Sequence, residues 1–195
     1  MPSPVGHILG GAAVYLAAAR KQDRSRVVLG LTLLGSILPD FDFFPGFFTG
    51  KLFAYHHGIS HSLTFAVFFT AVVFILAKWR QKKVASRAAI LAGLGYASHV
   101  ILDFLGGKEG TRGVPMFWPL SDKLFGLNLG LLGSFYFQGS SVWSVVRRDN
   151  APALLRELFI IGSPVLFLLW KEHRSKYFTV MLKADEEKRR RCRLR

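Results

Sequence analysis

The chain is poor in cysteine and in acidic residues. Of its 195 residues, one is cysteine (Cys192) and 12 are Asp or Glu, against 26 Lys and Arg. A single cysteine excludes an intramolecular disulfide framework and a cysteine-based zinc ribbon. If the protein binds a metal ion, histidine and carboxylate side chains must therefore supply the ligands.

Apolar residues are abundant, and they are gathered in long segments. They make up 51% of the chain, although its formal net charge is +14. Lys and Arg lie in blocks between the apolar segments, whereas a soluble nucleic-acid-binding protein spreads them along one face. We therefore favour a membrane protein, keep a basic nucleic-acid-binding protein as the weaker alternative, and expect no nucleic-acid partner. The apolar segments cover residues 5–19, 27–48, 58–77, 88–106, 124–146 and 158–170.

These segments predict an all-α fold, a multi-helix membrane bundle. Several are shorter than the about 20 residues that cross a bilayer, so we expect about five spanning or buried helices. Only one of the last two segments can span if the tail is to lie on the basic side, and residues 124–146 and 158–170 are equal candidates. Without repeats or linkers, the chain predicts one helical membrane domain over residues 1–170 and a basic cytoplasmic tail over residues 171–195.

The first apolar segment resembles the core of a secretory signal peptide. Such a signal needs a basic region before it, and no charged side chain precedes Arg20. We therefore predict a retained helix, with Ser3 as its N-cap and Pro4 at its first position.

Basic residues are divided unequally between the two ends of the predicted helices. One end receives residues 20–26, residues 78–87 and the tail, and the other end has far fewer Lys and Arg. By the positive-inside rule, the richer end is cytoplasmic. We expect a multi-pass protein of the cell (inner) membrane with its N-terminus outside, and a tail that contacts anionic lipid.

Imidazole and carboxylate groups lie near the ends of four predicted segments. In the predicted topology, all of them fall at the outer face of the membrane. Ionisable groups at such a depth are costly unless they are paired or coordinated. We therefore expect the bundle to gather them into one cluster. They are His7, Asp40, Asp42, His56, His57, His61, His99 and Asp103.

The spacing and chemistry of these residues indicate a metal site. His99 and Asp103 are four residues apart, so on a helix both side chains project from one face. Imidazole nitrogen and carboxylate oxygen, without thiolate, suit Zn(II) or another divalent ion such as Mn(II) or Fe(II). We expect one or two divalent ions, with Zn(II) preferred.

Two further carboxylates follow Pro39, which ends or kinks a helix at Leu38. In extended backbone, Asp40 and Asp42 would point to opposite sides. One of them would then be a terminal ligand, while the other bridges, orients a histidine or acts as a base. The sequence leaves these roles open.

Five stretches occur in order within roughly residues 2–125: PSPVGHILGG, LPDFD, HHGISHS, ASHVILDFLGG and VPMFWPLSDK. Together they resemble the YdjM-like family of membrane-bound, metal-dependent hydrolases. More distantly, that family is similar to the zinc-dependent phospholipases C and single-strand nucleases. The resemblance implies metal ligands at His7, Asp40, His56, His61, His99 and Asp103.

The chain departs from the family at His57, where members usually have Arg. An Arg there would pair with a phosphate or a carboxylate, and an imidazole can do so only when protonated. We expect His57 to lie beside the ligands and to contact substrate. The later His and Glu ligands of the distant relatives have no obvious match here, which favours one or two ions over three.

Together, these features predict a membrane-bound hydrolase that acts on a phosphoester, or another ester, of lipid-headgroup type through a metal-activated water. Asp40 or Asp42 is the expected general base, and Lys108 and Arg112 are expected to neutralise phosphate oxygens. Membrane lipid is thus an expected partner. The alternative is a metal-ion or proton transporter or channel, which requires polar residues that continue toward the opposite face.

Overall fold

The computed structural model describes residues 2–50, 55–80, 85–106, 113–127, 132 and 150–175. In these residues the fold is all-α, as predicted, with an isolated bridge between Val114 and Phe125 as its β-type pairing. The elements are α1 (Pro4–Ala18), η1 (Lys21–Asp23), α2 (Arg26–Ile37), η2 (Leu38–Phe43), α3 (Phe44–Thr49), η3 (Ile59–His61), α4 (Leu63–Trp79), α5 (Ala85–Leu105) and α6 (Ala151–Ile160).

Side-chain caps fix the start of three helices. In α1, Oγ of Ser3 accepts the N–H of Gly6 at 3.2 Å and Pro4 is the first helical residue, which confirms the predicted start. Ser25 caps α2 in the same way, and Ser62 caps α4. The cap at Ser62 corrects the predicted start of the third apolar segment, because residues 58–62 form a turn and a short 3-10 helix before α4 begins.

The second apolar segment is three elements and not one helix. Pro39 lacks an N–H and stops α2 at Ile37, after which the chain continues as the 3-10 helix η2 and the short helix α3. Asp40 and Asp42 therefore lie on a tight helical turn, not on extended backbone. This turn places both carboxylates on the site side of the bundle.

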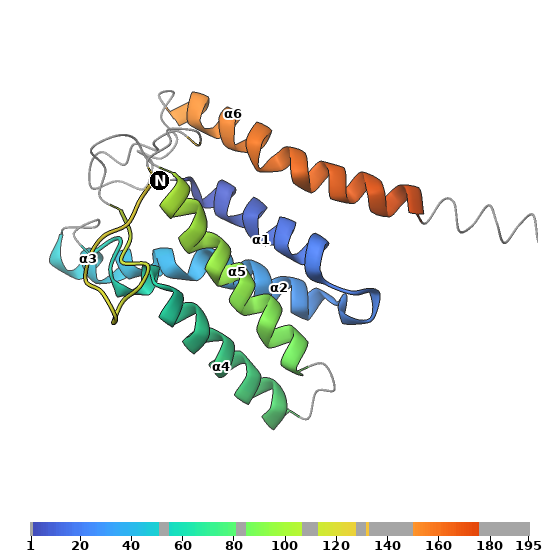
Figure 1. Cartoon of the computed structure of the whole chain (residues 1–195), viewed down its shortest axis with the longest axis horizontal. Helices are drawn as coiled ribbons and strands as arrows, with labels where there is room; N and C mark the ends of the chain where they lie inside the picture. The colour runs from blue at the N-terminus through green and yellow to red at the C-terminus, as the bar shows by residue number, and fades with distance from the viewer. Residues whose placement is uncertain are drawn as a thin grey trace, which may run out of the picture.

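Helix α5 lies at the centre of the bundle and packs against α1, α2 and α4 (Figure 1). Glycines allow the backbones to approach closely, as is common between membrane helices. A Cβ atom at Gly35 of α2 would lie 2.4 Å from the carbonyl oxygen of Ala92, and one at Gly95 of α5 would lie 2.2 Å from that of Thr32. The contact between α2 and α5 therefore depends on small residues.

Of the last two apolar segments, the structure describes a helix, α6, only for the second. Helix α6 continues after a turn residue, Ile161, as helix to Ser175, and Pro164 does not break it. The segment at residues 158–170 thus belongs to a longer apolar helix, while most of residues 124–146 lie outside the described residues. Among the described residues, three helical stretches could cross a membrane by length and composition: Arg26–Gly46, Ala85–Leu105 and Ala151–Ser175. Helices α1 and α4 are shorter and also apolar.

The two ends of the bundle differ in chemistry. The N-terminus, α3, the start of α4 and the end of α5 share one end (Figure 1). At the other end, Arg87 lies 3.5 Å from the buried Asp23, and Arg24 forms an ion pair with Glu172. The first end is the one that holds the predicted cluster of imidazoles and carboxylates.

Candidate metal centre

The predicted cluster is present at that end of the bundle, and its members come from four parts of the chain. His7 lies in the first turn of α1, and the two aspartates lie on η2. The turn before α4 supplies three histidines, and α5 supplies His99 and Asp103. His7, His61, His99 and Asp103 have side chains with no exposed surface.

Four ligand-type atoms form the centre of the cluster. Nε2 of His99 lies 3.1 Å from Oδ2 of Asp103, 3.3 Å from Nε2 of His61 and 3.4 Å from Oδ1 of Asp40. Nε2 of His61 is 3.4 Å from the same Asp103 oxygen and 3.7 Å from the same Asp40 oxygen. Two overlapping sets, His61–His99–Asp103 and His7–Asp40–His99, can each bring one ligand atom per residue within 4.8 Å of one another.

These separations fit the coordination shell of a small divalent ion. Ligand atoms placed tetrahedrally at about 2.0–2.1 Å from zinc lie about 3.3–3.4 Å from one another. The five distances around the centre range from 3.1 to 3.7 Å. The side chains could therefore hold such an ion without moving far.

The hydrogen-bond inventory also fits a metal site. Polar atoms in a protein interior normally have partners. Here both ring nitrogens of His7, Oδ1 of Asp40 and both carboxylate oxygens of Asp103 are buried without a hydrogen-bond partner. Nε2 of His7 lies 3.5 Å from Oδ1 of Asp103, and its ring stacks on His99 with centroids 3.6 Å apart. A cation would compensate for these buried groups.

Asp42 faces away from this centre and holds its neighbours. Its Oδ1 lies 2.9 Å from Nδ1 of His56, and its Oδ2 accepts the N–H of Gly58 at 3.1 Å and the hydroxyl of Ser60 at 3.0 Å. Nδ1 of His61 is 3.1 Å from the same Oδ2. These contacts favour the orienting role for Asp42, since a carboxylate on Nδ1 leaves Nε2 for a metal.

His99 is oriented in the same manner by the backbone. Its Nδ1 lies 2.8 Å from the carbonyl oxygen of Ser36 near the end of α2. Because a carbonyl only accepts, Nδ1 carries a proton, and Nε2 is the ring nitrogen that faces the centre and could bind a metal ion. No residue pattern predicts this contact, because a main-chain oxygen is present at every position.

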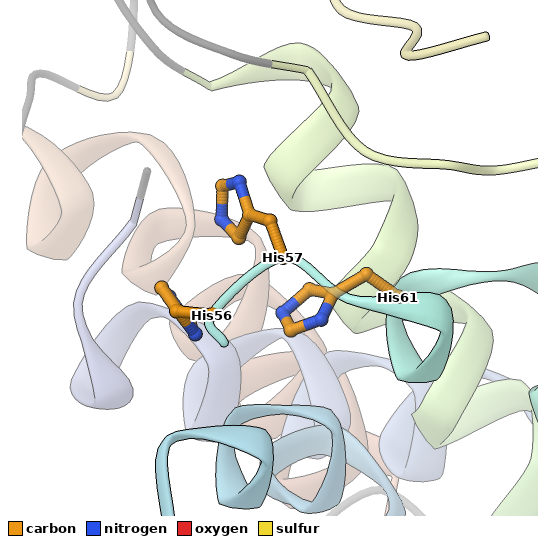
Figure 2. Close-up of side chains that lie close together, drawn as sticks. All are labelled: His56, His57 and His61. Carbon is orange, nitrogen blue, oxygen red and sulfur yellow. The ribbon is translucent and has the colours of Figure 1, made fainter. Parts of the chain in front are cut away.

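The two histidines at the entry to the turn lie at the border of the centre. Figure 2 shows His56, His57 and His61 close together, with ring centroids 4.6 to 5.2 Å apart. Nε2 of His56 is 3.9 Å from Oδ1 of Asp40, and Nε2 of His57 is 3.9 Å from Oδ2 of Asp103. Both can approach the centre.

His57 has an unusual backbone and an uncharged ring. Its φ is +64°, a left-handed conformation uncommon outside glycine. Burial lowers the pKa of its imidazole to about 4, and the nearby charge of Asp103 opposes this only in part. At neutral pH the ring is therefore uncharged, so it is suited to hydrogen bonding or metal ligation and not to charge pairing with a phosphate.

One buried carboxylate was missed by sequence reasoning. Glu157 of α6 is fully buried and accepts the N–H of Ser3 at 2.7 Å, as well as the Ser3 hydroxyl. It thus ties α6 to the start of the helix that carries His7. The available signal was a Glu directly before the apolar segment at residues 158–170. Lys108 and Arg112, predicted to contact phosphate, lie outside the described residues.

Comparison with known families gives one finding. The family model described as YdjM inner membrane protein matches residues 1–175. No curated protein and no solved structure gives a significant match. The match includes every candidate ligand and most of the 195-residue chain. This chain therefore belongs to the YdjM family of inner membrane proteins.

Proposed function

We propose that the protein is a metal-dependent hydrolase of the inner membrane that cleaves a phosphoester of lipid-headgroup type. The observation that carries this proposal is the set of inward-facing atoms of His61, His99 and Asp103, which lie 3.1 to 3.4 Å apart, with Oδ1 of Asp40 at 3.4 and 3.7 Å from the two imidazole nitrogens. His7 and His56 lie next to this group as further ligands. One or two ions, with Zn(II) preferred, suit such nitrogen and oxygen donors.

A metal ion bound here would supply Lewis acidity and a water of lowered pKa. The protein groups provide the rest of the chemistry. Of the two aspartates, Asp40 is better placed to take a proton, because both oxygens of Asp42 already accept hydrogen bonds or contact imidazole Nδ1 atoms. His57, uncharged and at the border of the centre, is suited to donate a hydrogen bond to a substrate oxygen.

The proposed orientation follows the basic residues. The end with Arg20, Arg24 and Arg87 would face the cytoplasm with the tail of residues 171–195, and the candidate centre would face outward. The tail would contact anionic lipid through its Lys and Arg side chains. Residues 1–170 would form the membrane domain.

A transporter is less well supported by the described residues. Between the cluster and Asp23 at the opposite end, their buried set contains no further carboxylate or imidazole along the bundle axis. The hydroxyls of Thr32 and Ser36 bond carbonyls of their own helix, at 2.8 Å each. A continuous polar path is therefore missing from this part of the molecule.

Metal content and hydrolysis test the proposal together. Purified protein should contain about one or two zinc equivalents and hydrolyse bis(p-nitrophenyl) phosphate in a metal-dependent reaction. His99→Ala and Asp103→Ala should lose both properties. Ser98→Ala is the matched control, because the Ser98 hydroxyl bonds only the carbonyl of Gly95 on the same helix.

Two results would contradict the proposal. Full metal content in both ligand variants would show that His99 and Asp103 do not bind the metal ion. Metal flux into liposomes that contain the wild-type protein, without hydrolysis of any phosphoester, would show that the protein is a transporter and not an enzyme.

A further inference from the structure

The depth of the candidate centre in a bilayer can be measured along the helices. Arg20 follows α1, and Arg87 lies near the start of α5, at the basic end of the bundle. Such side chains sit at the level of the lipid headgroups. They therefore mark one boundary of the hydrocarbon layer.

The candidate centre lies less than one hydrocarbon thickness from that boundary. Eleven residues of α1 separate His7 from Ala18, and twelve residues of α5 separate Arg87 from His99. At about 1.5 Å per residue, both paths are about 17–18 Å long. The hydrocarbon layer is about 30 Å thick. Even if the basic Cα atoms lie a few ångströms inside the boundary, the centre falls below the far surface of the layer.

The elements beyond the centre have the surface expected of this depth. Helix α3 exposes Phe44 at 56% and Phe48 at 81%, and Phe41 just before it is 53% exposed. In the segment at residues 113–127, Leu120 is 92% exposed. In water this would be a large apolar patch, whereas in hydrocarbon it fills the remaining thickness of the far leaflet.

Exposed apolar residues lie next to the accessible border of the centre in the sequence. Asp40 and His57 keep 15% and 18% of their side-chain surface exposed. Asp40 is followed directly by Phe41, and Ile59, two residues after His57, is 47% exposed. These two polar side chains are therefore flanked by exposed apolar residues on their own segments.

We infer that the centre lies within the hydrocarbon thickness of the leaflet opposite the basic connections, and that its substrate is a membrane phospholipid whose head group enters sideways from that leaflet. The acyl chains remain among lipid and the exposed aromatic side chains of α3 and Phe41, while the phosphoester reaches Asp40 and His57. The choice of substrate rests on the proposed hydrolase function, and the depth does not.

Fluorescence quenching tests the depth without reference to activity. In a Cys192→Ser background, Phe48→Cys carries an environment-sensitive fluorophore, and the protein is placed in phosphatidylcholine–phosphatidylglycerol nanodiscs. Lipids with a nitroxide on the acyl chain should quench this label at least as strongly as lipids with a nitroxide on the head group. Gln22→Cys, at the basic end, is the control and should show the reverse order. Head-group-dominated quenching at Phe48→Cys would overturn the inferred depth.

Hydrolysis of two substrates tests the route. Phosphatidylglycerol in nanodiscs represents the membrane source, and bis(p-nitrophenyl) phosphate the water-soluble source. Phe44→Ser should lower kcat/KM for the lipid about tenfold and leave the soluble substrate unchanged, since burial of a Phe side chain contributes about 1.5–3 kcal/mol. Phe167, on the far part of the α6 helix, is as exposed as Phe44, and Phe167→Ser should leave kcat/KM for both substrates unchanged.

The outcomes separate the two proposals. Equal losses on both substrates in Phe44→Ser, or preference for the soluble ester, would overturn sideways entry and leave the hydrolase standing. Cleavage of neither substrate by zinc-loaded protein would overturn the hydrolase and the choice of a phospholipid, while the quenching result would still decide the depth.

Discussion

Nδ1 of His56 lies 2.9 Å from Oδ1 of Asp42. The Asp42 carboxylate does not face the centre, but it orients the His56 ring toward the centre. The other oxygen of Asp42 holds Gly58 and Ser60 in the same turn. We predict that Asp42→Asn lowers zinc affinity about 10–100-fold, as is usual when an orienting partner is lost. Competition with a chromophoric chelator measures the change. An unchanged affinity would show that Asp42 does not orient the ligands.

Asp40→Asn should have the larger effect, because Oδ1 of Asp40 faces the ligand atoms of His61 and His99 directly. We expect zinc to be lost from the purified variant under conditions in which Asp42→Asn retains part of its metal. The same chelator titration compares the two variants. If Asp40→Asn binds zinc normally and lacks only activity, Asp40 acts as a base and not as a ligand.

The contact between α2 and α5 predicts opposite effects for two glycine substitutions. Gly95→Ala would place a Cβ atom 2.2 Å from the carbonyl oxygen of Thr32, so the helices must separate. We expect destabilisation of about 1–3 kcal/mol and weaker zinc binding, since the bond from His99 to Ser36 spans the same contact. Gly30→Ala meets no atom within 4 Å and should be neutral or up to about 1 kcal/mol stabilising. Thermal unfolding in detergent measures both, and equal effects would contradict the packing argument.

The buried link between Glu157 and Ser3 predicts a stability effect remote from the metal ligands. Glu157→Gln should cost about 1–3 kcal/mol, because an amide cannot accept the Ser3 N–H and hydroxyl with both of its polar atoms. Glu172→Gln, in a partly exposed ion pair with Arg24, should cost at most about 1 kcal/mol. The same unfolding assay ranks the two variants. A reversed ranking would show that Glu157 does not anchor α6.

Removal of metal should destabilise the folded protein. Oxygens of Asp40 and Asp103 are buried without hydrogen-bond partners. Once a chelator removes the metal ion, the burial of these carboxylates is no longer compensated and destabilises the folded state. At about 1,000 times its dissociation constant, a ligand that binds only the native state stabilises it by about 4 kcal/mol. A chelator should therefore lower the Tm, and added zinc should restore it. His99→Ala should show no response to either reagent.

Much of the fold could be predicted from the sequence because local chemistry decides it. Ser3 and Pro4 specify the start of α1, Pro39 specifies the end of α2, and the apolar segments indicate where the helices lie. The pairing of His99 with Asp103 follows from helical periodicity alone. The start of α4 was misplaced, because apolar residues near Ile59 continue across a turn that only the Ser62 cap reveals.

By itself, therefore, the sequence determined the helices, the basic end and the residues that bear the chemistry, because these depend on composition and spacing. Only the tertiary structure decided how those residues divide their roles. Asp40 faces the centre and Asp42 faces His56 because η2 is a 3-10 turn packed between α2 and the histidine turn. The contacts of His99 with Ser36 and of Glu157 with Ser3 join residues distant in the chain, and such contacts depend on how the helices pack.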